Sequence, residues 1–138
     1  LLDSSLKALK EIKDFTKKID QVIIIGMPLR HENQIFNVAV VIQKGEVLGI
    51  VPKTYIPNYS EFYEKRWFSS STNIKENKIN LFGKDIPFTT NITFADKDDK
   101  TFVLQLKFVK IYGVFILQVL IMLLMVLPSF LTYHQVMR

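Results

Sequence analysis

The sequence predicts an α/β fold, and three observations carry this prediction. Leucine, isoleucine and phenylalanine recur at three- and four-residue steps over residues 2–19, with lysines between them. This spacing is typical of an amphipathic helix that packs one face on a core. Three short apolar, β-branched runs follow at residues 22–25, 35–42 and 47–51, as in buried strands. Lys44-Gly45 separates the last two runs, which predicts a tight antiparallel hairpin.

Glycine and proline mark the expected element boundaries. Gly26 and Pro28 predict the end of the first strand, and Pro52 closes the third because proline cannot donate to a sheet ladder. Further short strands are expected at residues 79–82, 86–88, 92–94 and 101–106, after a loop at 55–68 with one helical turn. His31 falls in an expected turn and should be a surface residue, since one His–Glu pair lacks the ligand spacing of a metal site.

Composition excludes several classes of function. The 138 residues contain no cysteine, which excludes disulfides, thiolate metal sites and a cysteine nucleophile. The net charge of +5 is spread along the chain, without a basic block or an aromatic–basic motif, so no nucleic-acid partner is expected. No N-terminal signal is visible, and the expected location is the cytoplasm. The chain begins with leucine rather than methionine, so we expect a fragment.

Residues 51–69, VPKTYIPNYSEFYEKRWFS, are both aromatic and highly charged. Such a segment is typical of a pocket wall, from which a few polar groups project. Lys53 and Glu61 form the candidate site, with Lys53 just past a strand end, where chemistry is usually placed. The alternatives are a solvated lysine at the strand end and a salt bridge from Glu61 to Lys65 on a helical turn.

The stretch PKTYIPNYSEFYEKRWF resembles the lysine motif of the nitrilase (carbon–nitrogen hydrolase) superfamily. Within it, the chain is most similar to the glutaminase domain of glutamine-dependent NAD synthetases, and the preceding IIIGMPLRHENQIFNVAVVIQKGEVLGIVPK shares this likeness. The resemblance runs from about residue 1 to about 102 and is specific over 22–68. It implies part of an αββα nitrilase-type sandwich without its edges and partner layers. Buried faces would then be left open, and aggregation is expected.

Enzymes of this family hydrolyse a carbon–nitrogen bond with a Glu–Lys–Cys triad. Lys53 matches the lysine that stabilises the oxyanion. Glu61 matches a second glutamate that hydrogen-bonds this lysine and helps to position substrate. Tyr59 matches a tyrosine that borders the glutamine pocket; packing in the pocket wall is the alternative. The resemblance implies a glutamine-hydrolysing NAD synthase whose general-base glutamate lies upstream of Leu1, and the nucleophilic cysteine is missing. The fragment as written should be inactive.

The resemblance also implies partners. L-glutamine is the expected substrate, and the ammonia passes to a C-terminal synthetase domain that amidates deamido-NAD. ATP and magnesium belong to that absent domain, and no cofactor is expected in this fragment. Intact family members usually assemble as homo-oligomers. A fragment of a stand-alone nitrilase or amidase is an alternative function.

The apolar tail departs from the family. Residues 111–131 carry Gln118 as their only strongly polar side chain, and about 20 apolar residues span a bilayer. One interpretation is a tail-anchored membrane protein with a nitrilase-like scaffold and no activity. We favour another, in which residues 1–104 are a partial nitrilase domain and residues 105–138 an out-of-frame reading of the same domain.

Reading in another frame restores the motif that the family requires at this point, E-I-C-E-D-L-W. Allowed codons for residues 105–113, read from the third base, encode I-E-I-C-E-D-L-W, and residues 116–120 can yield P-P-S-S. Residues 125–138 can encode G-A-T-I-I-F-N-L-S and then S-N-E, without the alanine that usually precedes S-N-E. The nucleophile's codon would straddle those of Phe108 and Val109. The apolarity follows from the genetic code, because codons with a central T encode Phe, Leu, Ile, Met and Val.

Overall fold

A computed structural model describes residues 1–56, 58–59, 62–96, 102–111, 114–123 and 133–137, with the backbone alone at 58, 59, 62, 102 and from 107 onward. One helix, three short 3-10 turns and eleven strands are described, in this order: α1 (Leu2–Phe15), η1 (Thr16–Lys18), β1 (Ile23–His31), β2 (Gln34–Gln43), β3 (Glu46–Pro52), β4 (Asn58–Tyr59), β5 (Phe62–Tyr63), η2 (Glu64–Arg66), η3 (Ser71–Asn73), β6 (Lys78–Leu81), β7 (Lys84–Pro87), β8 (Ile92–Asp96), β9 (Phe102–Ile111), β10 (Val114–Leu123) and β11 (Tyr133–Met137).

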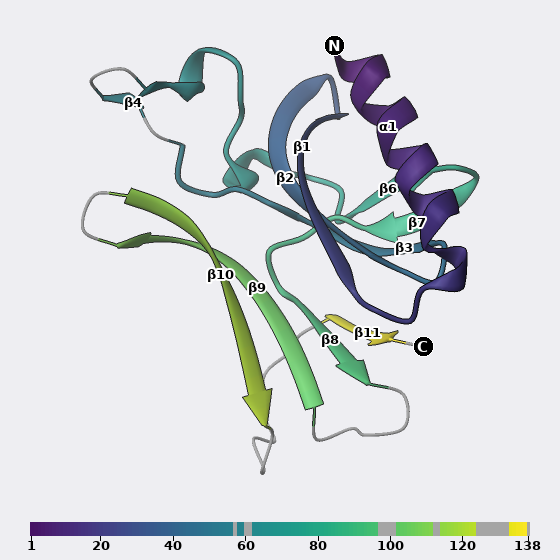
Figure 1. Cartoon of the computed structure of the whole chain (residues 1–138). Helices are drawn as coiled ribbons and strands as arrows, with labels where there is room; N and C mark the ends of the chain where they lie inside the picture. Colours follow the sequence, from purple (N-terminus) through teal and green to yellow (C-terminus); the bar gives the residue numbers. More distant parts are fainter. Residues whose placement is uncertain (57, 60–61, 97–101, 112–113, 124–132, 138) are drawn as a thin grey trace.

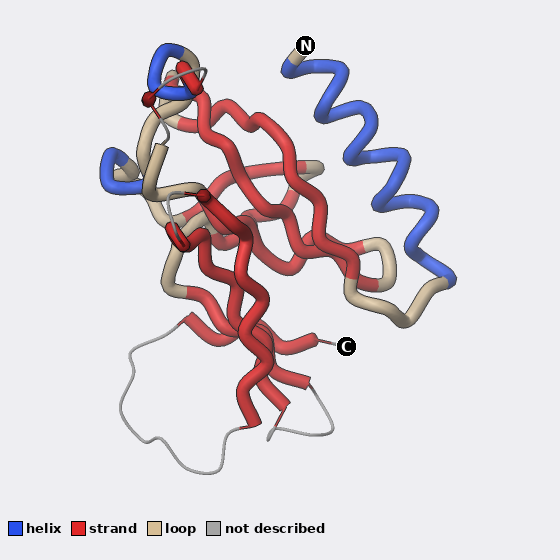
Figure 2. The backbone as a smooth tube through the Cα atoms, turned by 60° about the vertical axis from the view of Figure 1, so that its left-hand side comes forward, coloured by secondary structure: helices blue, strands red, loops and turns tan. Residues whose placement is uncertain are grey.

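The elements form three layers, which confirms the predicted mixed α/β class. The first sheet has the antiparallel order β1-β2-β3, and the second has the order β10-β9-β8-β11. Helix α1 and the β6-β7 hairpin cover one face of the first sheet, while β8 and β9 pack on its other face (Figures 1 and 2). The described residues therefore supply a helix layer followed by two sheets.

Strand β2 is buried on both faces, as its continuous apolar sequence predicts. Val38, Val40 and Ile42 pack toward α1 and the β6-β7 hairpin, and the alternate residues Ala39 and Val41 pack toward the second sheet. All five side chains are fully buried, at 0% exposure. The period-two alternation of a strand thus places β2 in the centre of two hydrophobic clusters.

Strand β1 is longer than the sequence predicted. Gly26 and Pro28 do not end it, because both lie within the paired region, opposite Ala39 and Asn37 of β2. Among the described strands, β1 is bonded to β2 alone and forms an edge of the sheet, the position at which a proline without an N–H is tolerated. The strand continues to His31.

His31 is buried, which corrects the expectation of a surface histidine. The residue is 8% exposed and its ring lies 4.6 Å from that of Phe88, between centroids. Its Nε2 lies 3.0 Å from the Glu76 carbonyl oxygen and 3.4 Å from Glu32 Oε1. Glu32 in turn accepts hydrogen bonds from the backbone N–H groups of Lys75 and Glu76. The tip of the β1-β2 hairpin therefore anchors the loop that precedes β6.

A register shift in β3 brings the two sheets close together at Gly49. The pairing of β2 with β3 slips between Val41 and Ile42 and leaves Leu48 as the extra residue. A Cβ built on Gly49 would lie 2.6 Å from Ile92 Cδ1 and 3.1 Å from the Phe94 ring. No larger side chain fits here unless the side chains of Ile92 and Phe94 move.

Replacing Gly49 by alanine should therefore destabilise the chain by about 1–3 kcal/mol, the usual cost of overpacking a filled core. Urea denaturation of Gly49→Ala would measure this. Gly26→Ala is the matched control, because nothing lies within 4 Å of a Cβ built there. Equal loss of stability in both variants would contradict the close approach of the sheets.

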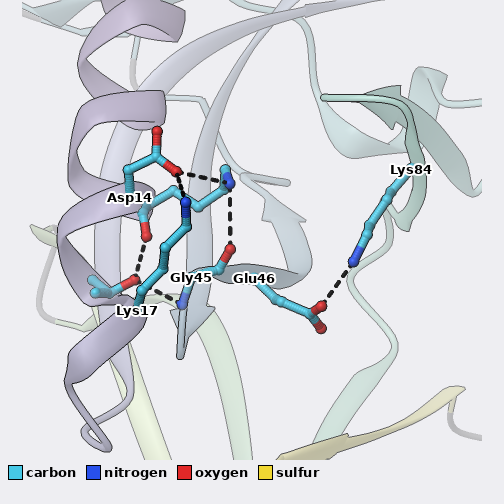
Figure 3. A network of polar contacts seen from close by, with 7 residues as sticks. Asp14, Lys17, Gly45, Glu46 and Lys84 are labelled. Atoms are coloured by element: carbon cyan, nitrogen blue, oxygen red, sulfur yellow. Dashed lines mark hydrogen bonds and ion pairs between the residues drawn. The ribbon is translucent and has the colours of Figure 1, made fainter.

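The end of α1 is tied to the β2-β3 turn by polar contacts (Figure 3). The Gly45 N–H donates to the fully buried Thr16 hydroxyl at 3.1 Å, and Lys13 Nζ donates to the Gly45 carbonyl at 3.3 Å. Lys44 and Gly45 have φ angles of 48° and 76°, the left-handed values of the predicted tight turn. The turn thus fixes the helix relative to the first sheet.

Asp14 adds a salt-sensitive contact at this helix end. Its Oδ1 lies 2.8 Å from Lys17 Nζ, and the hydrogen bond from this ammonium group lowers the pKa of the Asp14 carboxyl below its usual 3.8. Because the pKa of the Asp14 carboxyl is lower in the folded chain than in the unfolded chain, the contact stabilises the fold at pH values above the unfolded pKa. This contribution is lost as the pH falls and the carboxyl becomes protonated. Asp14→Asn should lower the melting temperature slightly at pH 7 and leave it unchanged at about pH 2, since both residues are solvent-exposed. Melting curves at the two pH values check this.

The C-terminal part of the chain forms strands. β9 and β10 pair antiparallel from Phe102↔Leu123 to Ile111↔Val114, and β11 pairs parallel with β8. In the described part of the chain, no helix has the length and apolarity needed to cross a membrane.

Candidate functional site

Lys53 lies directly after β3, as predicted from Pro52. Its backbone N–H donates to the Asn37 carbonyl of β2 at 2.9 Å, so the sheet fixes the main chain at this point. The side chain is only 8% exposed. A buried ammonium group needs polar partners, because desolvation of an unpaired charge is costly. Lys53 is therefore a buried, fixed lysine and not a solvated lysine at a strand end.

Glu64 supplies one of these partners. Its Oε2 lies 3.0 Å from Lys53 Nζ, and its side chain is 26% exposed. Glu64 begins the 3-10 turn η2, whose carbonyl at Glu64 accepts from the N–H groups of Trp67 and Phe68. The carboxylate is thus held by a local turn and faces Lys53, an arrangement that orients the ammonium group.

The sequence prediction had assigned this partner role to Glu61. Glu61 lies outside the described residues, and its role stays a prediction. Of Tyr59 the structure describes the backbone, in the short strand β4. Glu64 was missed because the segment contains two glutamates three residues apart. No local sequence pattern distinguishes Glu64, because its contact with Lys53 depends on the tertiary fold of the segment.

Three serine and threonine residues close the base of this segment. The Ser71 N–H donates to the Lys53 carbonyl at 3.0 Å, and the Ser70 hydroxyl donates to the Thr54 carbonyl at 2.6 Å. The hydroxyls of Thr54 and Ser71 lie 2.7 Å apart. Residues 54–70 therefore leave the end of β3 and return to it.

An apolar groove of about 740 Å³ lies beside this segment. The start of α1, the C-terminal part of β1, the start of β2 and the pair Trp67–Phe68 line it, and Lys53 is not among its lining residues. Tyr55, Tyr63 and Trp67 are 60%, 66% and 68% exposed. Within the described residues, no three side chains of His, Cys, Asp or Glu come together as a metal site.

Comparisons with known proteins identify the relatives of the chain. No family model matches it. It is 40% identical over 107 residues to the glutamine-dependent NAD(+) synthetase of Mycobacterium tuberculosis, which covers 78% of this chain and 16% of the relative. It is 42% identical over 62 residues to the synthetase of Aquifex aeolicus, covering 45% of this chain and 11% of that protein.

A solved structure agrees on the fold. The crystal structure of a glutamine-dependent NAD(+) synthetase from Cytophaga hutchinsonii superposes with a TM-score of 0.55 at 20% identity, over 67% of this chain and 18% of that one. This likeness confirms the fold class predicted from the sequence. The chain is thus a homologue of glutamine-dependent NAD(+) synthetases, and it spans 16% of the length of the Mycobacterium tuberculosis relative.

Proposed function

We propose that this chain is a piece of the glutamine-hydrolysing domain of a glutamine-dependent NAD synthetase, with Lys53 as the oxyanion-stabilising lysine. The observation that carries the proposal is the buried Lys53 ammonium group, fixed at a strand end and paired with Glu64 at 3.0 Å. Sequence identity of 40% to a protein named for glutamine dependence supports the choice of substrate.

In the proposed reaction a thiolate attacks the carboxamide carbon of glutamine, and the carbonyl oxygen becomes an oxyanion. The oxyanion collapses, the carbon–nitrogen bond breaks, and ammonia leaves after taking a proton from a general acid. Water then hydrolyses the thioester to glutamate. Lys53 acts at the oxyanion, where a preorganised donor is more effective than in water. Glu64 orients the Lys53 ammonium group. Glu61 is proposed to hydrogen-bond the same lysine and to help position the substrate, and Tyr59 to border the glutamine pocket.

The chain contains no cysteine, so it carries no thiol nucleophile. We therefore propose that it releases no ammonia from glutamine by itself. The intact protein would act in the cytoplasm as a homo-oligomer, and its synthetase domain would use ATP and magnesium to amidate deamido-NAD with this ammonia.

A chimera tests the function. Residues 22–68 of this chain would replace the corresponding segment of the Mycobacterium tuberculosis relative, and ammonia release from glutamine would be measured. Retained glutamine hydrolysis supports the proposal. Hydrolysis of other amides in preference to glutamine would favour a stand-alone amidase. Synthesis of NAD from free ammonia by the chimera's own synthetase domain is the control for folding.

We further propose that residues 105–138 are an out-of-frame reading of the same domain. The similarity to the Mycobacterium tuberculosis relative covers 107 residues, close to the length of the proposed in-frame part. Resequencing the DNA that encodes residues 95–113 tests this. A missing or extra base that restores E-I-C-E-D-L-W is the expected result. An unchanged sequence would overturn it and leave residues 105–138 as a genuine apolar segment.

A further inference from the structure

The loop that carries Glu64 begins and ends next to Lys53, the residue that Glu64 contacts. It leaves β3 after Lys53 and returns at Ser70 and Ser71, whose groups bond the carbonyls of Thr54 and Lys53. Closing a loop of about 16 residues costs entropy, and the hydrogen bonds at its base offset that cost. Specific hydrogen bonds therefore hold the two ends of the loop together at its base.

Two hydroxyl contacts distinguish this base from an ordinary turn. Thr54 Oγ1 and Ser71 Oγ lie 2.7 Å apart, and Ser70 Oγ donates to the Thr54 carbonyl at 2.6 Å. Ser70 Oγ also caps η3, where it accepts from the Thr72 N–H at 3.4 Å. We call Thr54, Ser70 and Ser71 the serine clamp.

The same turn is also tied to the first sheet. The Ser69 N–H donates to the Ile35 carbonyl at 2.7 Å, two residues from Asn37, which accepts from the Lys53 N–H. Strand β2 thus hydrogen-bonds both ends of this loop, at Lys53 and at Ser69. A lysine side chain has four rotatable bonds, so its ammonium group is aimed only if both its backbone and its ion partner are fixed.

We propose that Ser70 and Ser71 are positioning residues for Lys53. The clamp fixes the Lys53–Thr54 backbone and, through the closed loop, brings Glu64 into contact with the ammonium group. The significance for catalysis rests on the proposed function, in which Lys53 stabilises the oxyanion. The geometric role is a property of this chain and can be measured without any enzymatic activity.

Acetylation of lysines by an N-hydroxysuccinimide ester, followed by mass spectrometry, tests the clamp on the purified full chain. Wild-type Lys53 should react much more slowly than Lys84, whose side chain is 67% exposed. Ser70→Ala and Ser71→Ala should raise the rate at Lys53 by about threefold or more, as expected for one lost hydrogen bond, and leave Lys84 unchanged. Ser70→Thr and Ser71→Thr keep the hydroxyl and should restore the wild-type rate. Asn73→Ala, at an exposed position of the same turn, is the matched control.

An unchanged Lys53 rate in both alanine variants, or an equal rise at every lysine, would overturn the proposal. If the alanine variants do not fold, Thr54→Val removes one clamp hydroxyl with little change of shape and is read in the same way. The acetylation assay is independent of glutamine hydrolysis. If the chimera does not hydrolyse glutamine but the alanine variants still raise the acetylation rate at Lys53, the proposed function is rejected and the clamp is supported.

Discussion

Lys53→Met in the active chimera should lower kcat for glutamine hydrolysis by about 100- to 1,000-fold, the usual effect of removing one oxyanion donor. Methionine keeps much of the apolar stem of lysine and removes the charge. The loss should appear mainly in kcat, because the donor acts on charge that develops in the transition state. Steady-state ammonia release across glutamine concentrations measures both parameters.

Lys65→Met is the matched control, since this lysine lies in the same segment and is exposed. It should leave kcat within about twofold, as surface substitutions usually do. Glu64→Gln and Glu61→Gln, compared in the same chimera, separate the two glutamates. A larger loss of activity for Glu64→Gln would assign the lysine-orienting role to Glu64, whereas near-normal kcat in Lys53→Met would reject the site as a whole.

Phe88→Ala should destabilise the chain by about 3–5 kcal/mol, the usual cost of truncating a buried phenylalanine. Phe88 is fully buried, and its ring packs edge-on against Phe36 at 5.5 Å and beside His31 at 4.6 Å, between centroids. Its backbone also bridges to Ile50 of β3. The substitution would open a cavity where the β6-β7 hairpin meets the first sheet. Urea denaturation followed by circular dichroism gives the change in free energy of unfolding.

Phe15→Ala is the control for this prediction, because the Phe15 side chain is 74% exposed. It should change the free energy of unfolding by less than about 0.5 kcal/mol. Similar losses in the two variants would mean that Phe88 does not lie in the core.

The position of Lys53 could be predicted because local rules determine it. An apolar run ends at a proline, and the residue after it leaves the sheet. Its partner could not be predicted in this way. The contact between Lys53 and Glu64 depends on the 3-10 turn η2 and on closure of the loop at Ser70 and Ser71, whereas Glu61 lies outside the described residues. These are tertiary contacts, and no periodic pattern in the sequence indicates them.

The length of β1 was underestimated for a related reason. Gly26 and Pro28 were interpreted as a strand end, but an edge strand tolerates both. The turn lies instead at Glu32 and Asn33, whose φ angles are 48° and 60°. Glutamate is unusual at such a position, so the turn lacked the common asparagine–glycine signal. The burial of His31 follows from the longer strand.

The placement of β2 in both hydrophobic clusters has a consequence for cooperativity. Loss of the α1 layer would expose Val38, Val40 and Ile42, and loss of the second sheet would expose Ala39 and Val41. Disruption of either cluster would expose one of the two buried faces of β2. We therefore expect the layers to unfold together, with the amide protons of residues 38–42 exchanging with solvent only on global unfolding, as hydrogen-exchange measurements would show.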